Sequence, residues 1–318
     1  MIKRERVVRA IKFENPDRVP IWLLNRDQEQ GDIMWYDFRI QTWEHIASYH
    51  GGDVSEWGFK WKRLDDETMG QTEAVIKNWD DLDKYKFPGL NPDKRLKNLP
   101  EFKRKAKDYF QLAMPIITGF EIYKALRGFE NSMIDFAEEN KNSSYLLDGI
   151  FSFEKDLMTL AAEVSFDGFY FGDDWGTQID LMISPEMWKK VFKLRYKDQF
   201  DYAHKLGLYT VFHSCGNITK IIPELHEIGL DVMYISQPRV VDITRISRLF
   251  RGKQCFMSLI DYQEVSIPGT PEEIIKEGNY LYEMLGTEGG GFIGYIEDYS
   301  CMGMSNENFQ ACKKSFYL

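Results

Sequence analysis

The segment Leu208-Tyr209-Thr210-Val211-Phe212-His213-Ser214-Cys215-Gly216-Asn217 joins a short apolar run to a histidine and a cysteine. Such a run, rich in β-branched and aromatic residues, is typical of a buried strand. His213 and Cys215 stand two residues apart at its end, so alternation along a strand points both side chains the same way. Gly216 leaves the backbone free to turn away behind them. The segment predicts a strand whose carboxyl end carries two candidate metal ligands, and a core histidine beside a buried thiol is the alternative.

Other apolar runs end in the same manner, and segments with helical periodicity separate them. A helix is expected over Ser184–Leu206, with Ser184 as N-cap and Pro185 first in the helix, and another from Thr270 to about Leu285, stopped by Gly286. The remaining runs, each with the polar residues that follow it, are Gln111–Gly119 before Glu121, Phe166–Phe171 before Asp173 and Asp174, Asp231–Ile235 before Ser236 and Gln237, Gln254–Ile260 before Asp261, and Gly291–Ile296 before Glu297, Asp298 and Tyr299.

The spread of polar residues over many strand ends distinguishes between two α/β folds. In a (β/α)₈ barrel the carboxyl ends of all strands converge on one face, whereas an open sheet concentrates such residues at one switch point. The regions around Val19–Leu24 and Gly52–Phe59 leave room for two further strands. We therefore expect residues 1–318 to form a single domain, an α/β (β/α)₈ TIM barrel with an N-terminal extension. Residues 1–110 would be its irregular, aromatic-rich part, and residues 111–318 its regular β/α units.

Composition limits the classes of partner. The 318 residues carry a formal net charge of −10, which argues against nucleic acid or an anionic membrane surface. The charged start, Met1-Ile2-Lys3-Arg4, does not resemble a signal peptide, and the apolar runs are only strand-sized. The four cysteines are widely spaced, which favours free thiols or metal ligands over a disulfide framework. We expect a cytoplasmic protein without a nucleic-acid or membrane partner.

A metal centre is expected around His213 and Cys215, because Zn²⁺ accepts both at about 2.0–2.3 Å. A third protein ligand has to come from elsewhere in the chain. Cys301, in the loop after the last strand, is the first candidate, and Glu297 or Asp298 are the alternatives. The other two cysteines are expected elsewhere, Cys255 in the core at the start of its strand and Cys312 in a helix. A zinc ion with an open position would polarise an oxygen or activate a small nucleophile.

The remaining polar and aromatic residues at the predicted barrel mouth are candidates for catalysis and substrate binding. Carboxylates can exchange protons with a substrate, and aromatic side chains can line a pocket for an aromatic or methylated molecule, although plain packing is the commoner role of aromatics. The predicted catalytic residues are Glu121, Asp174 and Asp261, and the predicted substrate-binding residues are Trp22, Asp173, Gln237 and Tyr299.

Several motifs together resemble the uroporphyrinogen decarboxylase superfamily, in that family's order and over almost the whole chain. The resemblance implies a (β/α)₈ barrel with its cleft at the carboxyl ends of the strands, in agreement with the pattern above. The motifs are Met1–Ile11 with Pro16-Asp17-Arg18-Val19-Pro20, Leu126–Asn131, Gly172–Gln178, His213–Asn217, Asp261-Tyr262-Gln263 and Gly269–Glu273.

This superfamily contains decarboxylases and zinc- and corrinoid-dependent methyltransferases. The decarboxylases carry a Met-Arg-Gln-Ala-Gly-Arg stretch after the first strand, but here Ile21–Glu29 keeps one arginine among acidic residues, and Asp53–Trp57 does not match their catalytic aspartate motif. The methyltransferases carry a His-x-Cys pair, which His213 and Cys215 match, and a cysteine after the last strand. By spacing that cysteine would fall near Glu297 or Asp298, with Cys301 slightly beyond, so a shifted loop or a carboxylate ligand is implied. Some demethylating members use mixed carboxylate, cysteine and histidine ligands.

The resemblance therefore implies a methyltransferase that moves a methyl group from a methylated small molecule, such as a phenyl methyl ether, to cob(I)alamin, with zinc as Lewis acid. The chain has no Asp-x-His-x-x-Gly corrinoid motif, so the cobalamin is expected on a separate corrinoid protein. The alternatives, in order, are transfer from methylcobalamin to a thiol or a folate, uroporphyrinogen decarboxylation, and a barrel that binds a small ligand without catalysis. A homodimer is one option for assembly.

Overall fold

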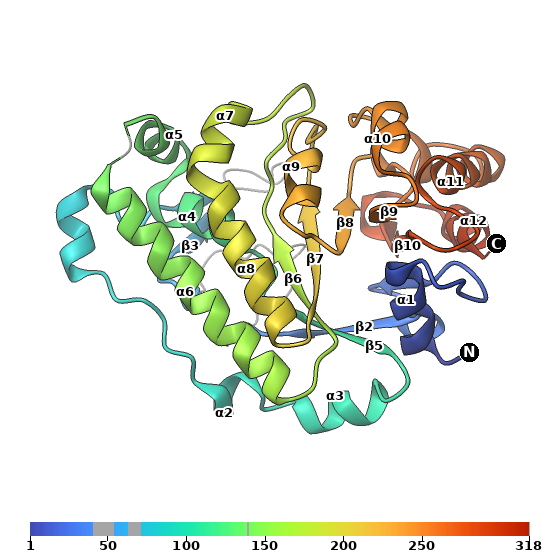
Figure 1. Cartoon of the computed structure of the whole chain (residues 1–318), viewed down its shortest axis with the longest axis horizontal. Helices are drawn as coiled ribbons and strands as arrows, with labels where there is room; N and C mark the ends of the chain where they lie inside the picture. The colour runs from blue at the N-terminus through green and yellow to red at the C-terminus, as the bar shows by residue number, and fades with distance from the viewer. Residues whose placement is uncertain (41–53, 63–70, 139, 318) are drawn as a thin grey trace.

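The computed structural model describes residues 1–40, 54–62, 71–138 and 140–317 (Figure 1). Eight strands form one sheet in the order β1-β10-β9-β8-β7-β6-β5-β2, and neighbouring strands in this order pair in parallel. The strands are β1 (Ile21–Leu24), β2 (Ile33–Asp37), β5 (Phe110–Met114), β6 (Gly168–Gly172), β7 (Tyr209–Ser214), β8 (Val232–Ile235), β9 (Cys255–Ser258) and β10 (Phe292–Glu297).

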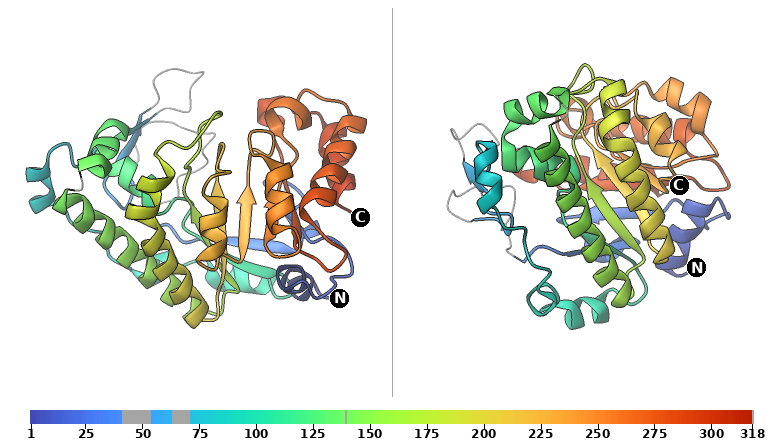
Figure 2. Two further views of the ribbon diagram at one scale, coloured as in Figure 1. Left: turned by 45° about the horizontal axis from the view of Figure 1, so that its top comes forward. Right: turned by 60° about the vertical axis from the view of Figure 1, so that its left-hand side comes forward.

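Helices cover the outside of this sheet (Figures 1 and 2). A short antiparallel ribbon, β3 (Lys60–Lys62) with β4 (Gln71–Glu73), stands apart from it. Among the described residues, no helix has the length and apolar character needed to cross a membrane. The helices are α1 (Lys3–Lys12), α2 (Pro92–Arg95), α3 (Leu99–Lys105), α4 (Gly119–Arg127), α5 (Phe129–Glu138), α6 (Lys141–Glu163), α7 (Pro185–Trp188), α8 (Leu194–Lys205), α9 (Ile222–Glu227), α10 (Ile243–Phe250), α11 (Pro271–Leu285) and α12 (Asn306–Phe316).

A buried ion cluster brings together the two strands at the ends of the sheet order, β1 and β2. Asp32, directly before β2, donates its N–H to the carbonyl of Ile21 (2.6 Å) and accepts the N–H of Ile21 on its carboxylate (2.8 Å). The same fully buried carboxylate accepts hydrogen bonds from Arg6 (2.6 Å) and Arg18 (2.8 Å). A buried charge requires such partners. These contacts nearly close the sheet on itself, and the predicted (β/α)₈ barrel is confirmed.

The interior of the barrel is packed with side chains, as alternation along its strands requires. Val7 and Ile11 of α1 belong to this interior cluster and close its amino-terminal end. Helix α1 is held there by backbone hydrogen bonds from Arg4 to Asp108 and from Gly291 to Ala10. The carboxyl ends of the strands, at the opposite end, are thus the open face. The strand residues of the interior cluster include Trp22, Ile33, Leu112, Tyr170, Val211, Tyr234, Met257 and Tyr295.

The helix boundaries expected from local sequence are confirmed. The Ser184 side chain accepts a hydrogen bond from the N–H of Met187, and the helical stretch continues through a π-turn (Lys189–Lys193) into α8. Thr270 and Glu273 form a reciprocal capping box at the start of α11, and Gly286 follows its last residue. Helix caps depend on residues within one helical turn, so they can be predicted without knowledge of the tertiary structure.

The eighth strand was predicted in the wrong place. The barrel takes β2 (Ile33–Asp37), whereas the described part of Gly52–Phe59 contributes an isolated bridge at Val54; Gly52 and Asp53 lie outside the described residues. β2 is only partly buried, so it lacks the continuous apolar pattern of the other strands. The run expected over Gln111–Gly119 is also shorter, because β5 ends at Met114 before Pro115, which has no N–H for the sheet.

Candidate metal centre

Asp174, His213 and Cys215 form a compact group at the carboxyl ends of β6 and β7. In the register of β6 and β7, Gly172 pairs with His213. Asp174, two residues after Gly172, therefore lies beside Cys215, two residues after His213. His213 Nε2 lies 3.6 Å from Cys215 Sγ and 3.4 Å from Asp174 Oδ1. One ligand atom from each of the three residues lies within 4.8 Å of the others.

This geometry fits a zinc ion. Tetrahedral bonds of about 2.0–2.3 Å place neighbouring ligand atoms about 3.5 Å apart, close to the two separations measured at His213. Nitrogen, sulfur and carboxylate oxygen are the donors that zinc takes in proteins. The side chains of His213 and Asp174 are 19% and 37% exposed, so one side of the group remains open to a small molecule. His213, Cys215 and Asp174 would hold the ion.

Neighbouring groups fix the orientation of these side chains. The N–H of Cys215 donates to Asp174 Oδ1 (2.8 Å), and the hydroxyl of Ser236 donates to Cys215 Sγ (3.3 Å). The N–H of Gly216 donates to Gln237 Oε1 (2.7 Å). Ser236 and Gln237 follow β8, the next strand of the barrel. Such outer contacts position metal ligands and reduce the freedom lost on binding.

The turn behind Cys215 requires glycine at two positions. Gly216 has φ +77°, in the left-handed region, and a Cβ atom there would lie 2.2 Å from the carbonyl carbon of Gly176. Gly176 in turn donates its N–H to the carbonyl of Cys215 (3.1 Å). The loops after β6 and β7 can approach this closely only because neither residue has a side chain.

The electrostatics of the group favour a cation. Burial alone would lower the pKa of His213, but the Cys215 sulfur and the Asp174 carboxylate outweigh burial and raise that pKa. Burial alone would raise the pKa of Asp174, but its hydrogen bond and charge interaction with His213 outweigh burial and lower that pKa. The carboxylate and the sulfur that favour a positive charge on the imidazole beside them also favour a divalent cation.

The His213 ring is held by aromatic packing. It stacks on Tyr170 with ring centroids 5.9 Å apart and meets Tyr234 edge-on at 4.6 Å. Its second nitrogen, Nδ1, is buried and has no hydrogen-bond partner among the described residues. Most metal-binding histidines donate this N–H to an acceptor. Here the two tyrosine rings take over the orienting role.

Glu297 and Cys301, predicted as candidate third ligands, lie outside this group of three. The Glu297 carboxylate accepts hydrogen bonds from the hydroxyls of Tyr295 (2.8 Å) and Tyr299 (3.1 Å), and burial raises its pKa. Cys301 is exposed in a short turn after β10. Asp298 accepts the backbone N–H of Ser300 (3.0 Å). The third member of this group is Asp174, which the sequence suggested as a catalytic residue.

Asp173 ties the end of β6 to the start of α4. Its fully buried carboxylate accepts hydrogen bonds from the hydroxyls of Tyr196 (2.6 Å) and Thr118 (3.0 Å) and from the N–H of Glu121 (2.9 Å). Burial raises the pKa of Glu121 to about 7, although the residue pairs with Lys124. A carboxyl group with that pKa is suited to proton transfer near neutral pH.

Glu154 of α6 supports the same helix start. Its Oε1 accepts the N–H of Gly119, the first residue of α4, at 2.6 Å. The side chain is 1% exposed, and burial together with the nearby Asp173 raises its pKa well above the usual range. The folded protein therefore holds a proton on Glu154 at pH values where an exposed glutamate is ionised.

That proton makes stability depend on pH. Above about pH 4.5 the unfolded chain releases it while the native state keeps it, so this site lowers the free energy of unfolding as pH rises towards the native pKa. Glu154→Gln keeps an acceptor for Gly119 and removes the titration. As pH rises, we expect the free energy of unfolding of the variant to increase relative to that of the wild type by up to about 1.4 kcal/mol per pH unit. Urea unfolding of both proteins with EDTA between pH 4.5 and 8 measures this, and parallel curves would contradict it.

The other predicted site residues are divided between the centre and the packed structure around it. Gln237 donates to the hydroxyl of Tyr262 (3.3 Å), whose ring lies 5.0 Å from that of Tyr299. Asp261 is buried and accepts the N–H groups of residues 263 and 264 at the start of a π-turn (Tyr262–Ser266). Trp22 is buried in the barrel interior, 5.2 Å from the ring of Tyr295.

The fold is similar to that of a methyltransferase from Methanosarcina mazei. The TM-score is 0.73 and the identity 13%, over 99% of this chain and 98% of that chain, which supports the same fold along the full length. D-psicose 3-epimerase (TM-score 0.43, 10% identity, 69% of this chain and 81% of that chain) and a type I 3-dehydroquinate dehydratase from Clostridium difficile (0.40, 8%, 70% and 75%) score too low for a closer comparison. No protein-family model and no curated protein matches the sequence.

Proposed function

We propose that the protein is a zinc-dependent methyltransferase that takes a methyl group from a methylated small molecule and passes it to cob(I)alamin on a separate corrinoid protein. The observation that carries this proposal is the group of Asp174, His213 and Cys215 at the open face of the barrel. The likeness in fold to a methyltransferase and the resemblance of the sequence motifs to the zinc- and corrinoid-dependent branch of the uroporphyrinogen decarboxylase superfamily support it.

A zinc ion at this centre supplies a Lewis acid for the heteroatom that carries the methyl group, which makes that atom a better leaving group. The three side chains leave one side of the centre open, and this sets the direction from which the donor would reach it. Glu121 interacts electrostatically with Asp174, and its pKa of about 7 suits it to protonate the departing heteroatom. The paired rings of Tyr262 and Tyr299 offer an aromatic face to the donor.

The arginine requirement of a porphyrinogen decarboxylase is poorly met. Arg26 is the arginine that remains in the stretch after β1, and its guanidinium donates to Asn306 (2.5 Å) and lies 4.4 Å from the ring centre of Phe309. It is therefore engaged with α12. A substrate with many carboxylates would find one arginine there, and that arginine already contacts α12. This arrangement disfavours porphyrinogen decarboxylation.

Formation of methylcobalamin tests the proposal. Protein, zinc and reduced corrinoid protein or free cob(I)alamin are combined with methoxyaromatics, methylamines or methanol in turn. We expect the methylcobalamin spectrum with one donor class, and a rate about 100- to 1000-fold lower without zinc, because the Lewis acid contributes several kcal/mol to the transition state.

Other outcomes assign a different activity. Loss of the methylcobalamin spectrum on addition of a thiol or a folate would show transfer in the opposite direction. Porphyrinogen decarboxylation without any cobalamin reaction would place the protein with the decarboxylases. No reaction in any assay, with zinc bound, would contradict the methyltransferase proposal and favour a barrel that only binds a ligand.

A further inference from the structure

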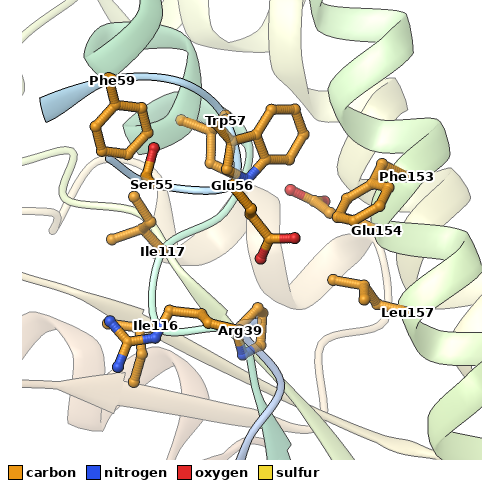
Figure 3. A pocket seen from close by; sticks show the side chains of 12 residues that line it. Arg39, Ser55, Glu56, Trp57, Phe59, Ile116, Ile117, Phe153, Glu154 and Leu157 are labelled. Carbon is orange, nitrogen blue, oxygen red and sulfur yellow. The ribbon is translucent and has the colours of Figure 1, made fainter. Parts of the chain in front are cut away.

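A cavity lies beside α6, walled in part by the segment that follows β5 (Figure 3). Its apolar walls include Trp57, Ile117, Phe153 and Leu157. It leaves about 30 Å³ for the centres of water-sized molecules, which corresponds to roughly two waters or a few heavy atoms of a ligand. None of its lining residues belongs to the metal centre.

Two buried polar groups in the cavity wall lack a hydrogen-bond partner among the described residues. They are the hydroxyl of Ser55, 7% exposed, and Oε2 of Glu154, 1% exposed. Figure 3 shows the Glu154 carboxyl group directed into the space beside Glu56. Buried polar groups are nearly always hydrogen-bonded, since leaving one unpaired is costly. Two such groups in one cavity indicate that a polar partner enters it.

The charged groups of the cavity wall are already neutralised. Glu56 forms an ion pair with Arg95, and Arg39 forms one with Asp37 (2.6 Å). The Arg95 guanidinium also lies 5.3 Å from the ring centre of Phe153, so that aromatic face is occupied by a cation. A charged ligand would find no free counter-charge, and a neutral one would find two unused hydrogen-bonding groups.

We propose that this cavity is a second binding site, for a compact neutral molecule with an apolar body and hydroxyl or amide atoms that hydrogen-bond Ser55 and Glu154. Its apolar body would contact Trp57 and Leu157. The site is separate from the metal centre, and the inference does not rest on the proposed methyl transfer.

The occupant would contact a segment that also reaches the metal side of the barrel. Ile117 lines the cavity, and the next two residues bind carboxylates: Thr118 donates its hydroxyl to Asp173, and Gly119 donates its N–H to Glu154. Asp173 directly precedes Asp174 of the metal centre. Occupation of the cavity would therefore stabilise the turn that joins β5 to α4.

Titration of the full chain with propionamide and with 1-propanol tests the inference, followed through the indole N–H resonance of Trp57, which Trp57→Phe assigns. We expect saturable binding in the millimolar range. Ser55→Ala should weaken it about tenfold, the effect of one lost hydrogen bond, and Leu157→Phe should abolish it by filling the cavity. Ser144→Ala, an exposed serine of α6, is the matched control and should bind like the wild type.

Three results would overturn the proposal. Non-saturable shifts would mean that the cavity holds only water. Equal affinity of wild type and Ser55→Ala would show that the hydroxyl is not a ligand group, and this comparison remains decisive if Leu157→Phe does not fold. Binding of xenon without binding of either polar molecule would show a dry cavity whose two polar groups stay unpaired.

Discussion

His213→Ala and Cys215→Ala will each remove nearly all zinc from the purified protein, which in the wild type will hold about one ion per chain. Three protein ligands enclose a zinc ion that keeps one open position, and the two that remain in a variant cannot. Loss of a group that only positions a ligand costs about 10- to 100-fold in affinity, so loss of a ligand itself should cost at least about 100-fold. Elemental analysis after reconstitution and dialysis measures the zinc content.

The same experiment distinguishes the candidates for the third ligand. Asp174→Ala should lose zinc like the other two variants, because its Oδ1 lies 3.4 Å from His213 Nε2. Cys301→Ser, which removes an exposed thiol, should retain it, as should Glu297→Gln. Loss of zinc from Cys301→Ser with retention in Asp174→Ala would reverse the assignment. Wild-type protein that stays metal-free would show that Cys215 is a structural thiol.

Local sequence was sufficient for features that depend on a few neighbouring residues. The alternation that directs His213 and Cys215 to one side is a property of any strand, and the capping residues Ser184 and Thr270 act within one helical turn. The close pairing of His213 and Cys215 therefore followed from their spacing alone.

The place of Asp174 beside them depends on non-local register. Gly172 pairs with His213 across two strands about 40 residues apart, and a shift of one residue would turn Asp174 away and bring Asp173 forward. No short-range pattern reports that register. The sequence therefore predicted a carboxylate at this strand end but could not say which of the two neighbouring aspartates faces the metal centre.

Carboxylates at strand ends also have a structural role that sequence alone does not separate from catalysis. The strand end is close to the start of the following helix, whose first N–H groups lack partners within the helix. Asp261 accepts two such N–H groups. Asp173, after β6, accepts one from the start of α4, the helix that follows the neighbouring strand β5, together with two hydroxyls. Both are buried by these contacts. In a barrel, a polar residue after a strand is thus a candidate for capping as much as for chemistry.

The closure of the barrel provides the second large expected effect. Asp32→Ala removes the carboxylate that binds Arg6, Arg18 and the N–H of Ile21, and leaves two guanidinium groups facing each other without their shared anion. Removing one partner from a buried ion cluster typically costs about 3–5 kcal/mol. We expect a loss of that size in the free energy of unfolding, measured by urea denaturation. Asp32→Asn should lose less, because its amide oxygen still accepts one of these hydrogen bonds.

Asp17→Ala is the matched control for this prediction. Asp17 also binds the Arg6 guanidinium, with an Nε–Oδ1 distance of 2.5 Å, but its side chain is 41% exposed, whereas that of Asp32 is fully buried. An ion pair whose carboxylate is this exposed should contribute no more than about 1 kcal/mol, since water and the remaining Asp32 carboxylate replace the lost partner. Both alanine variants lose a contact with Arg6. The difference between their free energies of unfolding therefore reports what the buried carboxylate of Asp32 contributes beyond that contact. If the free energy of unfolding falls by the same small amount in both variants, packing of β1 against β2 closes the barrel and the ion cluster contributes little to its stability.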